Sequence, residues 1–203
     1  ISHSHYDHLD VDSVRQLHAR SGGKLHFFVP LGLKAWFAGL GIDTVSELDW
    51  WEHAEIKGVR FTLTPVQHWS ARGLFDRNRT LWGGWAIEAP DLNFFFAGDT
   101  GYSADFREIG NRLGPFDFAA LPIGAYEPRW FMQAQHVDPA EALRIHRDIR
   151  ARQSLGVHWS AFEMADDALD EAPRALAAAR QSAGIDETEF FVLRVGETRR
   201  IAH

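Results

Sequence analysis

The feature that most limits what this chain can fold into is the hexapeptide His-Ser-His-Tyr-Asp-His at residues 3–8. It places three imidazoles and one carboxylate within six positions. Imidazole nitrogen and carboxylate oxygen are ligands that suit zinc and neighbouring transition metals. In an extended segment His3, His5 and Asp7 would share one face, and a turn would let the motif, with His8, serve two metal ions. The alternative is a solvated histidine-rich end or a tag remnant, although tags are runs of histidine without interleaved aspartate.

The amino-acid composition limits which ligands could hold a metal at this motif and which partners the chain could bind. The 203 residues include no cysteine, so a metal would be held by His, Asp or Glu rather than by thiolates. The formal net charge of −7 argues against nucleic acid as the main partner, because such binding calls for a basic face. No apolar run approaches the ~20 residues that span a bilayer, and no signal peptide is recognisable. We therefore expect a cytoplasmic or peripheral membrane location.

Short apolar strands alternate with amphipathic helices along the chain, which is typical of an α/β layered fold built as one domain over residues 1–203. The predicted strands are 25–29, 59–64, 80–88, 92–97, 117–121 and 154–159, followed by a closing hairpin of 190–195 and 198–202. The predicted helices are one capped by Asp10 or Asp12 and ended by 21–23, then 31–40, 104–113, 138–152 and 171–183. Asp138, Pro139 and Glu141 form the start signal of the fourth helix.

Three predicted strands end just before a potential ligand: His68, Asp99 and His158. Ligands gather at strand ends in layered α/β folds, so we expect these residues to meet the first motif. Seven candidate ligands are too many for one four-coordinate zinc but suit two metals that share a carboxylate, for which Asp99 is placed on a tight turn. Taken singly, a histidine after a strand is more often structural, and Asp99 could be an ordinary turn residue.

These residues resemble a known family. The first motif is similar to the His-x-His-x-Asp-His signature of the metallo-β-lactamase superfamily, and His68, Asp99 and His158 follow in that family's order. Residues 96–102, 121–132 and 135–139 further resemble the phospholipases D that hydrolyse N-acyl-phosphatidylethanolamine, and the likeness extends over nearly the whole chain. One departure is Ser160-Ala161, where those enzymes have Gly-Thr.

The resemblance implies a four-layer αββα sandwich with two zinc ions, or iron or manganese, at one edge. It implies that His3, His5 and His68 hold one metal, that Asp7, His8 and His158 hold the other, and that Asp99 bridges them. It also implies strands upstream of the motif. Because the chain begins with Ile1 and leaves no room for them, we expect residues 1–203 to be the C-terminal portion of a longer hydrolase domain that exposes a sheet edge.

The same resemblance assigns catalytic roles to Asp7, Asp99 and His136. The expected substrate-binding residues are Tyr6, Tyr126, Arg129, Trp130, Gln135 and His136. Several of them have a plainer alternative: the aromatic residues of the 123–137 loop could fill the core, Arg129 could pair with a carboxylate, and His136 could be structural. The pair Trp50-Trp51 could meet a membrane interface or pack in the core.

Three classes of function remain open at this stage. The first is a zinc phosphodiesterase that cleaves N-acyl-phosphatidylethanolamine to N-acylethanolamine and phosphatidic acid. The second is a hydrolase of the same fold acting on a lactone, a thioester or a nucleotide phosphodiester, because a fold alone does not select a substrate. The third is an inactive truncated binding module. The family resemblance also admits a homodimer and a peripheral contact with a membrane.

Overall fold

The computed structural model describes residues 1–201, and its strands form two sheets. The larger sheet has seven strands in the order β3-β4-β5-β6-β7-β8-β9, and the smaller pairs β1 with β2 in parallel. The strands are β1 Phe27–Pro30, β2 Val45–Leu48, β3 His53–Ile56, β4 Val59–Thr64, β5 Gly84–Ala89, β6 Leu92–Phe96, β7 Phe116–Pro122, β8 Ala151–Val157 and β9 Phe190–Phe191. The helices are α1 Val11–Arg20, α2 Lys34–Ala38, α3 Asp105–Leu113, α4 Arg129–Met132, α5 Pro139–Asp148 and α6 Glu171–Ala183.

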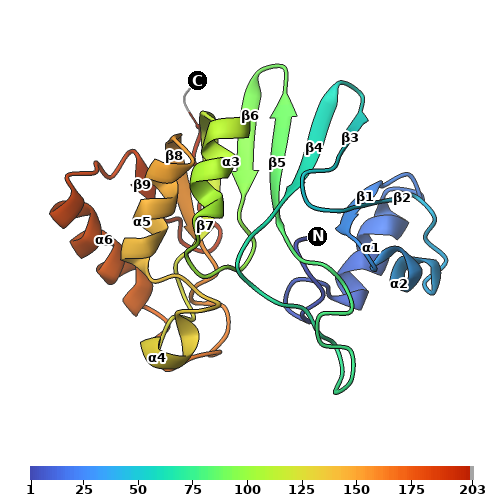
Figure 1. The fold of residues 1–203 in the computed structure, drawn as a ribbon, viewed down its shortest axis with the longest axis horizontal. Helices are drawn as coiled ribbons and strands as arrows, with labels where there is room; N and C mark the ends of the chain where they lie inside the picture. Colours follow the sequence, from blue (N-terminus) through green and yellow to red (C-terminus); the bar gives the residue numbers. More distant parts are fainter. Residues whose placement is uncertain (202–203) are drawn as a thin grey trace.

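The elements stack in four layers (Figure 1). Helices α3, α5 and α6 pack on one face of the large sheet through a core that includes Phe106, Ile145 and Leu176. A second core joins the two sheets and includes Leu63 and Trp85. A third core packs α1 and α2 on the small sheet. The αββα layering expected from the sequence is therefore present, with two strands in the second sheet of the described residues.

Local signals account for several of these elements. The Asp138 carboxylate accepts a hydrogen bond from the N–H of Glu141, the Glu141 side chain returns to the N–H of Asp138, and together they form the predicted capping box of α5. Asp10 caps α1 by accepting a hydrogen bond from the N–H of Ser13, without a reciprocal side-chain bond. Gly184 ends α6 with φ +65°, a conformation that glycine adopts without steric cost. Short-range chemistry thus sets where these helices begin or end.

The predicted closing hairpin is wrong. Phe190 and Phe191 pair in parallel with β8, and the residues from 192 to 201 form no strand. The two phenylalanines are buried, whereas Val195 is fully exposed. The predicted second arm therefore has no apolar surface to pack against. Residue 202 of the predicted arm lies outside the described residues.

Other predicted boundaries also need correction. Helix α5 ends at Asp148 rather than near 152, because Arg150 adopts φ +58° and the following residues join β8. The strand predicted to begin at residue 80 begins at Gly84. Strands β2 and β3 were not predicted.

An open apolar groove of about 310 Å³ lies beside the small sheet. Its walls include Phe28 of β1, Phe61 of β4 and Phe94 and Phe96 of β6. None of the helices in the described part of the chain is long and apolar enough to cross a membrane.

Candidate metal centre

The strand ends bring the later candidates to one edge of the large sheet. Strand β4 is antiparallel to β5, and β5 is antiparallel to β6, so β4 and β6 run in the same direction. Strands β6, β7 and β8 are parallel. His68, Asp99 and His158 follow β4, β6 and β8 respectively, and all three therefore lie at the same edge.

The hexapeptide meets these residues through a turn. The N–H groups of His8 and Leu9 both donate to the carbonyl of His5, at 3.1 and 2.8 Å. This turn separates the side chains into two groups that share Asp99. One group is His3, His5, His68 and Asp99, and the other is Asp7, His8, Asp99 and His158. Within each group the potential ligand atoms lie within 4.8 Å of one another.

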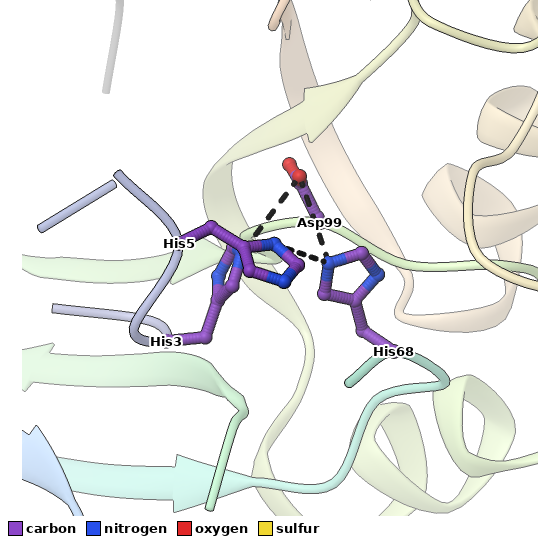
Figure 2. Close-up of side chains that lie close together, drawn as sticks. All are labelled: His3, His5, His68 and Asp99. Carbon is purple, nitrogen blue, oxygen red and sulfur yellow. Dashed lines mark hydrogen bonds and ion pairs between the residues drawn. The ribbon is translucent and has the colours of Figure 1, made fainter. Parts of the chain in front are cut away.

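In the first group the ring nitrogens converge (Figure 2). His3 Nε2 lies 2.9 Å from His5 Nδ1, and His68 Nε2 lies 3.3 Å from the same atom. Asp99 Oδ2 is 3.9 Å from His3 Nε2 and 3.8 Å from His68 Nε2. His68 Nδ1 lies 3.1 Å from the carbonyl of Gln135, and a carbonyl only accepts, so the proton of a neutral His68 sits on Nδ1 and the Nε2 lone pair faces the group.

The second group places two imidazoles between two carboxylates. His8 Nε2 is 3.0 Å from Asp7 Oδ2 and 3.2 Å from Asp99 Oδ2. His158 Nε2 is 3.2 Å from Asp99 Oδ1 and 3.5 Å from Asp7 Oδ2. Among the described residues, His8 Nε2, His158 Nε2 and Asp99 Oδ1 are buried without a partner in hydrogen-bonding geometry. Buried unpaired donors and acceptors are costly, and a shared cation would satisfy all three.

Burial sets the charge of the first group. Desolvation lowers the pKa of His3 to about 2 and that of His68 to about 3, and it also lowers the pKa of His5. These imidazoles are therefore neutral at physiological pH. The neutral ring is the form that binds a metal.

In the second group the two carboxylates have the larger effect on the histidine pKa values. Burial opposes the charge of His8, but Asp7 and Asp99 outweigh it and raise the pKa of His8 to about 9. The same balance raises the pKa of His158. Burial alone would raise the pKa of Asp7 and Asp99, yet the nearby imidazoles reverse this and hold both pKa values below the usual range. Both carboxylates are therefore ionised, and their charge suits a cation; a metal bound here would displace the proton that His8 otherwise holds.

His136 lies beside both groups. Its ring centroid is 5.3 Å from that of His68 and 5.8 Å from that of His158. Its Nδ1 is buried without a hydrogen-bond partner among the described residues, and burial lowers its pKa. A neutral imidazole in this position can donate a hydrogen bond toward a ligand of the site.

The other predicted substrate-binding residues differ in exposure and in their hydrogen-bond partners. Tyr6 is 66% exposed, and its hydroxyl donates to the carbonyl of Arg72 at 3.0 Å. Tyr126 is buried and donates to Glu171. Arg129 donates to the carbonyl of His136 and forms an ion pair with Glu141 at 2.7 Å. Trp130 is 80% exposed on α4, and Gln135 uses its backbone carbonyl to orient His68.

The Trp50-Trp51 pair is packed against other side chains. The indole N–H of Trp50 donates to the carbonyl of Trp82, and the guanidinium of Arg112 stacks over the ring of Trp51. Of the two readings of this pair, the surroundings favour packing.

A cavity of about 160 Å³ opens beside the second group, and sequence reasoning missed its wall. Asp7, His8 and His158 line one side, and Phe162 and Met164 of the 159–169 loop line the other. The loop is anchored by Asp167, whose carboxylate accepts from the N–H groups of residues 125, 126 and 127 at 3.0, 2.9 and 3.2 Å. Two signals in the sequence pointed to this loop: its position directly after His158 and the departure at Ser160-Ala161, which line the cavity.

Comparison with known proteins gives a family match. A family model described as the Beta-lactamase superfamily domain matches residues 1–159. The chain is 43% identical to N-acyl-phosphatidylethanolamine-hydrolyzing phospholipase D 1 of Caenorhabditis elegans, over 97% of this chain and 58% of that protein. It is 37% identical to the mitochondrial enzyme of the same name in Saccharomyces cerevisiae, over 82% of this chain and 37% of that one. The chain thus spans about half the length of these relatives.

A solved structure has the same fold. Igni18, a metallo hydrolase from Ignicoccus hospitalis, superimposes with a TM-score of 0.73 over 97% of this chain and 76% of its own. The identity is 23%, so this likeness concerns the fold.

Proposed function

This chain belongs to the β-lactamase superfamily and has the metallo-β-lactamase fold, and from that premise we propose that it is a metal-dependent phosphodiesterase of the phospholipase D type. The proposed reaction cleaves N-acyl-phosphatidylethanolamine to N-acylethanolamine and phosphatidic acid. The observation that carries the proposal is the pair of ligand groups that share Asp99, in a chain 43% identical to a phospholipase D. Two zinc ions are the proposed occupants, and iron or manganese suit the same ligands.

Metals held by the two groups would supply positive charge for the phosphate oxygens and lower the pKa of a water near neutrality. Residues of the chain would orient the water and contact the substrate. Ionised Asp7, which lines the cavity, accepts a hydrogen bond from the attacking water and orients its oxygen toward phosphorus. His136 donates a hydrogen bond to the phosphate or to the leaving oxygen.

The balance of the reaction is simple. The water oxygen forms a bond to phosphorus, the bond from phosphorus to the ethanolamide oxygen breaks, and one proton passes from water to the departing alcohol. The cavity beside His158, walled by Phe162 and Met164, offers apolar surface next to this polar centre.

The test measures metal per chain by elemental analysis and release of N-acylethanolamine from the lipid. The Asp99→Asn variant should lose about 10³-fold or more of the turnover, because it removes the charge shared by both groups. The control is Asp10→Asn, since Asp10 is the N-cap of α1 and asparagine also caps a helix.

Three results would count against the proposal. Full turnover in Asp99→Asn would remove the shared carboxylate from the mechanism. Two metals per chain with cleavage of a lactone or thioester, but not of the lipid, would move the chain to another hydrolase class. Metal without any turnover would leave a binding module.

A further inference from the structure

Four large apolar side chains are exposed on two segments near the metal centre. Leu74 and Phe75 are 92% and 88% exposed in the loop between β4 and β5, and Trp130 and Phe131 are 80% and 56% exposed on α4. In Figure 1 this loop and α4 both project at the lower edge of the molecule. We call these four side chains the apolar tips.

The loop is built to hold its tip outward. The Asp76 carboxylate accepts from the N–H of Gly73 at 2.8 Å and from the N–H of Arg72, which closes the turn around Leu74 and Phe75. The hydroxyl of Tyr6 donates to the carbonyl of Arg72, and this bond ties the loop to the metal-binding motif. Single exposed apolar residues are common on proteins. Adjacent ones held outward by a hydrogen-bonded turn instead indicate an interaction site.

The charge around the loop identifies the kind of partner. Residues 72–79 carry three arginines against one aspartate, a net charge of +2 in a chain of −7. Arg77 and Arg79 are both exposed. Apolar side chains flanked by cations are the pattern that binds the interface of an anionic lipid bilayer, where the chains enter the acyl boundary and the cations meet phosphate groups.

We propose that the apolar tips insert into the surface of an anionic phospholipid bilayer and turn the opening of the metal centre toward it. The inference rests on the proposed function, because a lipid substrate would then enter directly from the membrane. The two segments that carry the tips project separately from the molecule, which favours a deformable lipid surface over a second copy of the chain. The cavity walled by Phe162 and Met164 opens on the same metal centre.

The experiment is co-sedimentation with vesicles of phosphatidylcholine and phosphatidylglycerol, compared with phosphatidylcholine alone. The chain should bind the mixed vesicles more strongly. The variant Leu74→Ser/Phe75→Ser should bind them about tenfold or more weakly, because two apolar side chains no longer enter the lipid. The variant Arg77→Gln/Arg79→Gln should lose most of the preference for anionic vesicles, by roughly tenfold. The matched control is Leu17→Ser on α1, which is also exposed and apolar.

Two further readouts separate this inference from the proposed function. Cleavage of a soluble aryl phosphodiester should be unchanged in Leu74→Ser/Phe75→Ser, because these residues lie outside the metal centre. Asp99→Asn should still bind vesicles even when it has no turnover. No vesicle binding by the unaltered chain, or equal binding by the double variant, would overturn the inference. So would a double variant that changes only the monomer–dimer equilibrium in analytical ultracentrifugation.

Discussion

At the residue scale, the site depends on backbone conformations that side chains rarely adopt. Ala125, His158 and Ser160 have φ values of +61°, +60° and +65°, and all three line the cavity beside the second ligand group. Such conformations persist only where the surrounding structure enforces them, and they are common at functional sites. Gly98 has φ +63° directly before Asp99, and a Cβ there would lie 2.7 Å from Cβ of Ser2.

We predict that Gly98→Ala displaces the metal-binding motif from Asp99. The substitution adds left-handed strain of about 1 kcal/mol and a steric conflict of about 1–3 kcal/mol. Metal content should fall and the free energy of unfolding should decrease, as measured by elemental analysis and urea denaturation. The control is Gly58→Ala, where φ is +77° but nothing lies within 4 Å of the added Cβ. Equal losses in the two variants would show that the close approach to Ser2 is unimportant.

At the scale of elements, strands carry the ligands and one loop shapes the approach to them. The loop after β8 has no strand or helix between residues 158 and 170, so its position depends on side-chain anchors. Asp167 is the main one, with three backbone N–H donors. Such a carboxylate connects the cavity wall to the segment that follows β7.

We predict that Asp167→Ala loosens this wall and leaves the metal ligands in place. Three N–H groups lose their acceptor, which costs about 1–3 kcal/mol. The KM for the lipid should rise roughly tenfold while metal content is retained. The control is Asp166→Ala, because Asp166 is exposed and contributes its backbone N–H to the carbonyl of Glu127. An unchanged KM in Asp167→Ala would mean that substrate does not contact the wall.

At the scale of the whole molecule, buried histidines couple stability to pH. His146 on α5 is buried away from the metal centre, and its Nδ1 lies 2.8 Å from Ser154 Oγ of β8. Burial lowers the pKa of His146 below its usual value of 6.5. The unfolded chain therefore takes up a proton at a higher pH than the folded chain. The stability contributed by neutral His146 is present above pH 6.5 and is lost as the pH falls toward the folded pKa.

We predict that His146→Gln flattens this dependence. The variant should be less stable than the unaltered chain by the largest amount near pH 7.5 and by a smaller amount near pH 5. At low pH only the unaltered chain loses stability from excluding a proton that its unfolded state binds. Urea unfolding of metal-free protein at the two pH values measures the difference. His53→Gln on the exposed face of β3 should leave the slope unchanged. A parallel shift of His146→Gln at both pH values would contradict the prediction.

The sequence alone determined the features that depend on local order. The hexapeptide, the three strand ends and the capping signal of Asp138 could be recognised because ligand spacing, strand alternation and helix caps act over a few residues. The sequence left the cap of α1 open between Asp10 and Asp12, and the structure assigns it to Asp10. The αββα class followed from the family resemblance. The same local reasoning failed at the closing hairpin, where pairing with β8 decided the outcome.

Only the tertiary structure decided which side chains face the centre. Tyr126 and Trp130 belong to one loop motif, yet the first is buried against Glu171 and the second is exposed. The turn at His5, the cavity wall beyond His158 and the braced loop of Leu74 depend on contacts between distant segments. The physical reason is that burial and hydrogen bonding between elements are set by how whole layers pack, which no window of neighbouring residues contains.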